Sequence, residues 1–259
     1  MLTDLQTIYR PDTLEEAAVR LKTPGVFPIY GGGASLIRRG GEGARAAVDL
    51  SRVIISQCAL SDQACQIESG TTLETIAASD DQLHMVIAAE VPLTLRNALT
   101  LGGVLMECRP NSLLLALLLG LDARVNCYGR EPFNIARWFD LTADERRQCL
   151  IQNVVFPYYP VAPIRVSLEK ISRTPADAPI VAALGFAQGG YRSSTKVNFY
   201  CVVCGLAGRP LRFQPADLPN LQSQISDYKG SAEYRTTVGK IVSQRAVLSA
   251  VKRASEGHW

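Results

Sequence analysis

Two clusters of glycine constrain the folding of this chain more than any other feature of its sequence. Three consecutive glycines, Gly31–Gly33, follow the apolar segment 26–30, and the pair Gly102 and Gly103 interrupts a second apolar segment. Glycine in the interior of a helix or strand costs about 0.5–1 kcal/mol relative to alanine. Each cluster therefore indicates either a tight turn or a close approach of the backbone to something large.

Such clusters can build a site for phosphate. Backbone amides of glycine approach phosphate oxygens closely because no Cβ atom intervenes. Ser35 and Thr100 stand beside the two clusters and add hydroxyl donors. If the clusters are adjacent in space, together they would hold a pyrophosphate; if they are not, each is an ordinary turn. Neither cluster fits G-x-G-x-x-G or G-x-x-x-x-G-K-[ST], which argues against a Rossmann dehydrogenase and a P-loop NTPase.

Composition and charge exclude several other classes of function. The net charge is +3 and no run of five or more basic residues occurs, so nothing indicates a nucleic-acid partner. The amino terminus lacks the pattern of a secretory signal. The longest apolar segment, Leu113–Leu121, has nine residues, whereas a membrane-spanning helix needs about 20. We therefore expect a cytoplasmic protein with no membrane span.

The seven cysteines are an odd number in a chain without an export signal, which favours free thiols. Cys201 and Cys204 form a C-x-x-C, and a metal or redox role for them is one alternative. They lie, however, in a β-branched and aromatic segment typical of a strand, where residues three apart face opposite sides. The chain has two histidines and no second C-x-x-C. We expect no metal site.

The pattern of apolar residues predicts a mixture of helices and strands. The first part is expected to hold a helix over 13–23 capped by Thr13, a strand over 26–30, a helix over 35–40 and a strand over 46–53. A second block is expected to hold a strand over 65–69, a helix over 71–79, a helix over 112–121, strand and loop over 123–139, and a strand over 151–157.

Three prolines within residues 157–163 indicate a boundary. The last third is predicted to form three antiparallel strands, over 163–172, 179–188 and 196–206, and a helical tail over 234–254. In that tail, Tyr234 and Arg235 are expected to anchor the carboxy-terminal helices, and a subunit contact is the alternative.

Several segments in a fixed order then carry a resemblance. From Tyr9 to Val251, nearly the whole chain, the succession is similar to the FAD-binding medium subunit of molybdenum hydroxylases, the carbon-monoxide dehydrogenase and xanthine dehydrogenase family. The segments are YRPDTLEEAAVRL, YGGGASLIRRG, VDLSRV, IESGTTLETIA, LRNALTLGGVL, RPNSLLLALLLGLDARV and SAEYRTTVGKIVSQRAV.

The resemblance implies an α+β fold of two domains. Residues 1–160 would form an FAD-binding domain of the vanillyl-alcohol-oxidase (PCMH) type, with α/β subdomains at about 1–56 and 57–160. Residues 161–259 would form a smaller domain with a three-stranded antiparallel sheet and helices.

The resemblance also implies the residues that hold FAD. The family's first pyrophosphate loop falls on Gly31, Gly32, Gly33, Ala34, Ser35 and Leu36. The second falls on the segment from Arg96, with Thr100, Leu101, Gly102 and Gly103 as its candidate contacts. Asn111 or Ser112 would replace an aspartate that the family directs at the ribityl chain, and Lys170 matches a family lysine close to the flavin. No catalytic side chain is implied, because the chemistry belongs to the cofactor.

The implied function is an electron-transfer subunit of a molybdopterin-dependent oxidoreductase. Its expected partners are a large subunit with the molybdenum cofactor and a small subunit with two-iron two-sulfur clusters, and its flavin would reduce an acceptor such as NAD or a quinone. Val104 and Leu113 depart from the family pattern, as do Ala34 and Leu99. The alternative is therefore a structural subunit whose degenerate site binds FAD weakly or not at all. An autonomous oxidase of the vanillyl-alcohol type would need a larger substrate domain than the last hundred residues provide.

Overall fold

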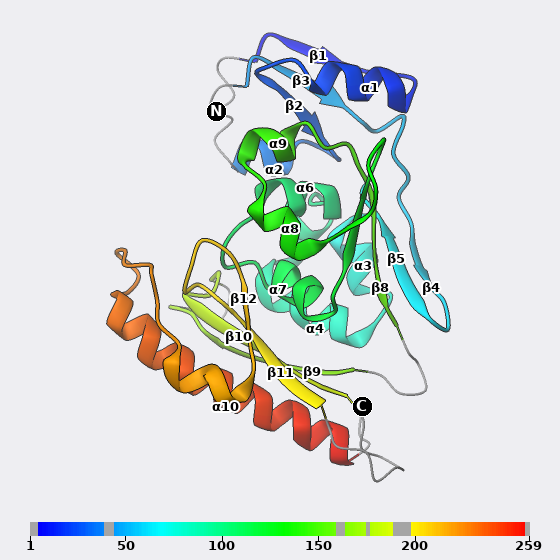
Figure 1. The fold of residues 1–259 in the computed structure, drawn as a ribbon. Helices are drawn as coiled ribbons and strands as arrows, with labels where there is room; N and C mark the ends of the chain where they lie inside the picture. The colour runs from blue at the N-terminus through cyan, green and yellow to red at the C-terminus, as the bar shows by residue number, and fades with distance from the viewer. Residues whose placement is uncertain (1–4, 39–43, 159–163, 175–176, 189–197, 257–259) are drawn as a thin grey trace.

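The computed structural model describes residues 5–38, 44–158, 164–174, 177–188 and 198–256 of the chain. These residues form three β-sheets, whose strand orders are β1-β3-β2, β4-β5-β8-β6-β7 and β12-β11-β10-β9. Figure 1 shows the three sheets following one another along the molecule, with the first at the blue end and the last beside α10 at the red end. The mixture of helices and sheets agrees with the expected α+β class.

The first sheet is parallel, and the loop that follows its strand β2 carries the first glycine cluster. Its elements are β1 (Thr7–Tyr9), α1 (Leu14–Leu21), β2 (Val26–Ile29), α2 (Ala34–Arg38) and β3 (Ala46–Asp49). The Glu16 amide donates to Thr13 Oγ1 at 3.1 Å, so Thr13 caps α1 as predicted. Residues 30–33 join β2 to α2, and Gly33 has a φ of +77°, a conformation that favours glycine.

The second sheet is antiparallel, and helices lie in the connections from β5 to β6 and from β7 to β8. Its elements are β4 (Cys58–Leu60), β5 (Ala64–Glu68), α3 (Leu73–Ala77), α4 (Asp81–Glu90), α5 (Leu93–Arg96), α6 (Leu101–Glu107), α7 (Leu113–Gly120), β6 (Arg124–Cys127), β7 (Phe133–Asn134), α8 (Ile135–Asp140), α9 (Ala143–Arg147) and β8 (Ile151–Pro157). Every residue of α7 is buried. This helix contacts α4 as well as β10 and β11, so it joins the second sheet's helices to the third sheet.

One predicted segment of this part is wrong. Residues 131–139 were expected to be strand and loop, but most of them form α8. The Ala136 amide donates to Asn134 Oδ1 at 2.8 Å, so Asn134 caps the helix. Asparagine is a preferred residue at this position, and it is the sequence signal for the start of α8.

The third sheet is antiparallel and consists of β9 (Arg165–Ile171), β10 (Val181–Gln188), β11 (Asn198–Cys204) and β12 (Leu211–Phe213). The three longer strands confirm the prediction for the last third, but the expected three-stranded sheet has a fourth strand. A 3₁₀-helix (Pro215–Asn220) and one long helix, α10 (Ala232–Glu256), complete the described part of this region, where several helices were expected. A strand of three residues is too short to show an alternating pattern.

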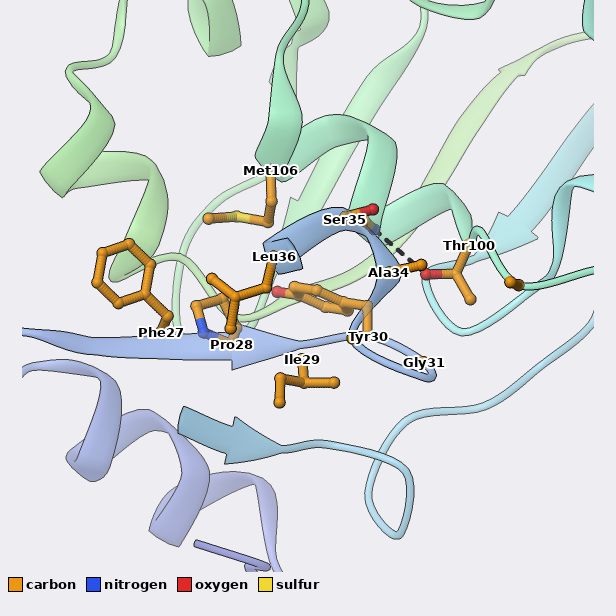
Figure 2. A pocket seen from close by; sticks show the side chains of 13 residues that line it. Phe27, Pro28, Ile29, Tyr30, Gly31, Ala34, Ser35, Leu36, Thr100 and Met106 are labelled. Carbon is orange, nitrogen blue, oxygen red and sulfur yellow. Dashed lines mark hydrogen bonds between the residues drawn. The ribbon is translucent and has the colours of Figure 1, made fainter. Parts of the chain in front are cut away.

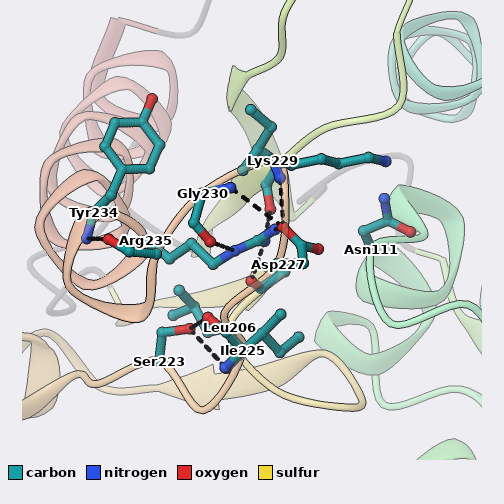
Figure 3. A network of polar contacts seen from close by, with 12 residues as sticks. Asn111, Leu206, Ser223, Ile225, Asp227, Lys229, Gly230, Tyr234 and Arg235 are labelled. Carbon is teal, nitrogen blue, oxygen red and sulfur yellow. Dashed lines mark hydrogen bonds and ion pairs between the residues drawn. The ribbon is translucent and has the colours of Figure 1, made fainter.

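Arg235 fastens α10 to the loop before it and to the third sheet. Its Nη1 donates to the carbonyls of Ile180 (2.7 Å) and Gly205 (2.9 Å), and its Nε donates to the carbonyl of Gly230 (3.2 Å). Its Nη2 lies 2.7 Å from Asp227 Oδ1. Figure 3 shows the side chain reaching from the helix into this group. The anchoring role is thus confirmed for Arg235.

The prediction that Cys201 and Cys204 face opposite sides of a strand is also confirmed. Within the described ranges, no helix is both long and apolar enough to cross a membrane. Cys201 packs with the side chains between the third sheet and α10, whereas Cys204 packs in the main core on the other side of the sheet. All seven cysteines are free thiols. The described residues contain no group of three or more acidic, histidine or cysteine side chains that could hold a metal ion.

Candidate functional site

The two glycine clusters meet at one pocket. The pocket is open to solvent, and its space of about 380 Å³ includes part of that solvent. The residues that line it come from β2 and the loop after it, and from the segment around the start of α6: Phe27, Pro28, Ile29, Tyr30, Gly31, Gly33, Ala34, Ser35, Leu36, Ala98, Thr100, Gly103 and Met106. Figure 2 shows the first loop passing directly beside Thr100. The predicted adjacency of the clusters is confirmed.

The first cluster offers backbone donors to this pocket. No described residue accepts a hydrogen bond from the backbone amides of residues 31–36, which form the turn after β2 and the start of α2. A Cβ atom built on Gly32 or Gly33 would meet nothing within 4 Å. The backbone here is therefore accessible at close range, which is what an anionic oxygen ligand requires.

The second cluster differs from the first in that its amides are engaged within the protein. The Gly102 amide donates to the Ser69 carbonyl at 2.8 Å, and the Leu101 amide donates to the Thr71 carbonyl at 3.0 Å. The Gly103 amide donates to Thr100 Oγ1 at 3.3 Å, the bond by which Thr100 caps α6. The expectation that both clusters have free amides is therefore correct for the first cluster and wrong for the second, while binding of a diphosphate by the first stays a prediction.

The glycine pair is explained by the first loop itself. A Cβ atom on Gly102 would lie 2.4 Å from Tyr30 Cδ1, and one on Gly103 would lie 2.4 Å from Ser35 Oγ. On the opposite side, a Cβ atom on Gly31 would lie 2.8 Å from Thr100 Cγ2. Side chains at any of these positions would push the loops apart. The large object that the sequence required at Gly102 is thus the ring of Tyr30.

Tyr30 was not singled out from the sequence, yet it connects the first loop to the second sheet. Its hydroxyl donates to the Cys149 carbonyl at 3.1 Å and accepts from the Ile151 amide at 2.7 Å. Burial raises the pKa of Tyr30 well above the ordinary value for tyrosine, so the side chain is a neutral phenol at physiological pH. The sequence signal that could have identified this residue is a tyrosine directly before a glycine cluster.

The remaining candidates of the two loops differ in accessibility. Ala34, Ser35 and Leu36 line the pocket, while Gly32 is exposed beside it. Leu101 is fully buried and packs in the core. The pocket's described lining carries no charged side chain, so backbone amides and the hydroxyls of Ser35 and Thr100 are its polar groups.

Ser112 and Lys170 do not line this pocket. Ser112 is 1 % exposed and caps α7, accepting a hydrogen bond from the Leu115 amide at 3.4 Å. Lys170 extends from β9 to the carbonyl of Ala89, at 2.8 Å, and burial lowers the pKa of its ammonium group. Both residues thus lie near the end of α4.

Glu90, the last residue of α4, was missed by the sequence reasoning. Its Oε2 accepts a hydrogen bond from the Leu114 amide at 2.9 Å, so a carboxylate from α4 occupies the amino end of α7. Burial raises the pKa of Glu90, while hydrogen bonds from Leu114 and Ser112 oppose the shift. No local pattern links two residues 24 positions apart. The side chains at Val104 and Leu113, where the chain departs from the family pattern, are buried in the main core.

The comparisons with known proteins agree with this geometry. The family model described as the FAD binding domain in molybdopterin dehydrogenase matches residues 3–159. No curated protein matches the chain by sequence.

Solved structures match over almost the whole length. One chain of carbon monoxide dehydrogenase from Hydrogenophaga pseudoflava, in a form that lacks the Mo-pyranopterin moiety of its molybdenum cofactor, has a TM-score of 0.84 and 17% identity. Chains of reconstituted CO dehydrogenase from Oligotropha carboxidovorans and of quinoline 2-oxidoreductase from Pseudomonas putida 86 have TM-scores of 0.82 and 0.80, both with 19% identity. Each match covers 98% of this chain and 99% of the other. At such identities the likeness concerns the fold.

Proposed function

Since the chain belongs to the family of FAD-binding domains in molybdopterin dehydrogenases, we propose that it is the FAD-carrying, electron-transferring subunit of a multi-subunit oxidoreductase. Bound FAD would supply electron transfer between iron–sulfur clusters and an acceptor such as NAD or a quinone. The proposed partners are a large subunit with the molybdenum cofactor and a small subunit with two-iron two-sulfur clusters. The solved structures with the same fold are a carbon monoxide dehydrogenase and a quinoline 2-oxidoreductase, which supports this assignment.

One observation carries the FAD site: the unpartnered amides of residues 31–36 line a pocket that the second glycine loop completes. These amides would hold the diphosphate, because they approach it without an intervening Cβ atom. The hydroxyl of Ser35 has no hydrogen-bond partner among the described residues, and it would add a donor. Thr100 Oγ1 already accepts a bond from Gly103, so its own hydrogen is the one directed elsewhere.

In this proposal the second loop supports the first and does not itself bind through its amides. Its amides are fixed by Ser69, Thr71 and Thr100, and its glycines leave room for Tyr30 and Ser35. Ser112 and Lys170, which do not line this pocket, would act at a distance from the diphosphate. The division at about residue 160, with subdomains meeting near residue 56, stays a proposal that is consistent with the extents of the three sheets.

The alternative function is a structural subunit with a degenerate flavin site. The buried leucine at position 113 favours it, because the family's aspartate is missing there and Glu90 has bonded the nearby amides. Loss of one neutral hydrogen bond costs about 0.5–1.5 kcal/mol. Such losses weaken binding by about tenfold for every 1.4 kcal/mol.

A binding experiment on the full chain separates the two functions. The purified protein is expected to be yellow, to release FAD on denaturation, and to bind FAD again after the flavin has been removed. Gly32→Val places a branched side chain beside the open backbone of the first loop and should weaken FAD binding at least tenfold. Gly208→Val is the matched control, because Gly208 is also exposed and has open space where its Cβ would lie. A colourless protein that cannot be loaded with FAD would establish the structural alternative.

A further inference from the structure

Two cysteines form a thiol pair at the outer edge of the second sheet. In the β4–β5 hairpin, Cys58 stands opposite Ile67 and Cys65 stands opposite Leu60. Cys58 and Cys65 are therefore diagonal neighbours on one face of the hairpin. Each thiol affects the ionisation of the other, as two neighbouring side chains on one face do.

The two thiols differ in access to solvent. Cys58 is partly exposed, whereas Cys65 is fully buried. Cys58 Sγ also lies 3.3 Å from Ser79 Oγ, a hydroxyl that donates in turn to the Ile76 carbonyl at 2.7 Å. A dissolved reagent therefore reaches Cys58 first, and Cys65 stands behind it.

The surroundings favour the thiolate on Cys58. The contact with Cys65 lowers the pKa of Cys58, burial opposes this, and the contact with Ser79 lowers it as well, so that the pKa is about 6. The contact with Cys58, together with burial, raises the pKa of Cys65. The carboxylate of Asp80 opposes ionisation of both thiols, and Tyr158 lies near Asp80 and Cys65. Because the thiolate is the nucleophilic form, Cys58 is the more reactive sulfur at neutral pH.

We propose that Cys58 and Cys65 are a peroxide-oxidised dithiol, with Cys58 as the attacking sulfur and Cys65 as the resolving sulfur. The Cys58 thiolate attacks one oxygen of a hydroperoxide, the O–O bond breaks, and Cys58 becomes a sulfenic acid while hydroxide or alkoxide leaves and takes up a proton. The Cys65 sulfur then attacks the Cys58 sulfur, the S–O bond breaks, and water leaves with the Cys65 proton. One peroxide is reduced for each disulfide formed.

The second step requires a small movement of the hairpin. The sulfurs must approach from their diagonal positions across the hairpin to a bond of about 2.05 Å. Strand β4 has three residues and, in the sheet as described, pairs only with β5. It is therefore the element that can shift with the least loss of backbone hydrogen bonds.

The chain supplies its own control. Cys127 and Cys149 also affect each other's ionisation, but their exposed fractions are 3 % and 1 %. The two pairs have the same chemistry and differ in access. Only the Cys58–Cys65 pair should react while the protein is folded.

The test uses the full chain, fully reduced and then treated with hydrogen peroxide. After the reaction is stopped, free thiols are alkylated under denaturing conditions and the peptides are identified by mass spectrometry. We expect a Cys58–Cys65 disulfide, with Cys127 and Cys149 still alkylated. The rate should fall about tenfold per pH unit below about pH 6, because the thiolate is then lost.

Two variants test the assigned order. Cys65→Ala should leave a sulfenic acid on Cys58 that a dimedone reagent traps, and Cys58→Ser should leave Cys65 reduced. The proposal is overturned if Cys58 stays reduced in the wild-type protein, or if the Cys127–Cys149 pair is oxidised as fast. The wild-type result stands even if a variant fails to fold.

Discussion

The ring of Tyr30 occupies the volume that any side chain at position 102 would need, with 2.4 Å between Tyr30 Cδ1 and the place of a Cβ on Gly102. The contact joins the first glycine loop to the second, and the tyrosine hydroxyl continues the connection into the second sheet. Several expected outcomes depend on this packing.

Substituting the glycine should destabilise the whole fold. Gly102→Ala forces the ring or the start of α6 to move, and overpacking of this kind costs about 1–3 kcal/mol. Equilibrium unfolding in denaturant measures the loss. Gly208→Ala, at an exposed turn with open space, should change the unfolding free energy by less than about 0.5 kcal/mol. Equal effects of the two substitutions would contradict the packing argument.

Removing the tyrosine hydroxyl should also weaken the fold, for a different reason. Tyr30→Phe keeps the ring against Gly102 but leaves the buried Ile151 amide without its acceptor. An unsatisfied buried donor costs about 1–3 kcal/mol. Because the ring stays in place, the pocket and its FAD affinity should change little. The free energy of unfolding of Tyr30→Phe should nevertheless fall. A large loss of FAD affinity in a protein of unchanged stability would oppose this account.

Ser35 and Gly103 should show an interaction energy. Gly103→Ala alone brings a Cβ to 2.4 Å from Ser35 Oγ, and Ser35→Gly removes the atom that it meets. In a double-mutant cycle, the two changes together should be less destabilising than their sum by about 1 kcal/mol or more. Pairing Gly103→Ala with Ser255→Gly, in the last turn of α10, should give additive effects.

Arg235 should be a large single contributor to the stability of the third sheet. Arg235→Met removes the buried guanidinium group, and with it the donors to Ile180, Gly205 and Gly230. Each buried carbonyl that loses its donor costs about 1–3 kcal/mol, whereas Asp227 is 39% exposed and stays solvated. Arg245→Met, an exposed position on the same helix, is the control and should be close to neutral. Thermal unfolding of the three proteins measures the difference.

Glu90 should make stability depend on pH in a particular direction. Its pKa is raised in the folded protein, so the carboxyl group favours folding when it is protonated and opposes folding when it is charged. Compared with Glu90→Gln, the wild-type protein should lose stability as pH rises above the unfolded value of about 4.3. The difference should become constant above the folded pKa. Urea unfolding of both proteins across this range gives the curve, and an opposite slope would disprove the assignment.

The sequence predicted the adjacency of the two loops but not the role of each. A glycine pair indicates that something lies close, and the same pattern serves a bound phosphate or a packed side chain. At Gly102 and Gly103 the partners are Tyr30 and Ser35, which are about 70 residues away in the chain. Only coordinates distinguish these cases.

Some of the helices and strands could be predicted from local sequence patterns, and others could not. The capped helix after Thr13 and the long strands of the third sheet follow from local patterns. By contrast, β12 is too short for its pattern to be visible, and Glu90 acts on the start of α7 from a distant helix. The cap at Asn134 was visible in the sequence and was missed.

The bend at Ser69–Thr71 holds the second loop through carbonyl groups of the protein itself. The side of the pocket that the second loop forms is therefore complete once the chain has folded, before a cofactor binds. A newly made chain can therefore fold first and be charged with flavin later.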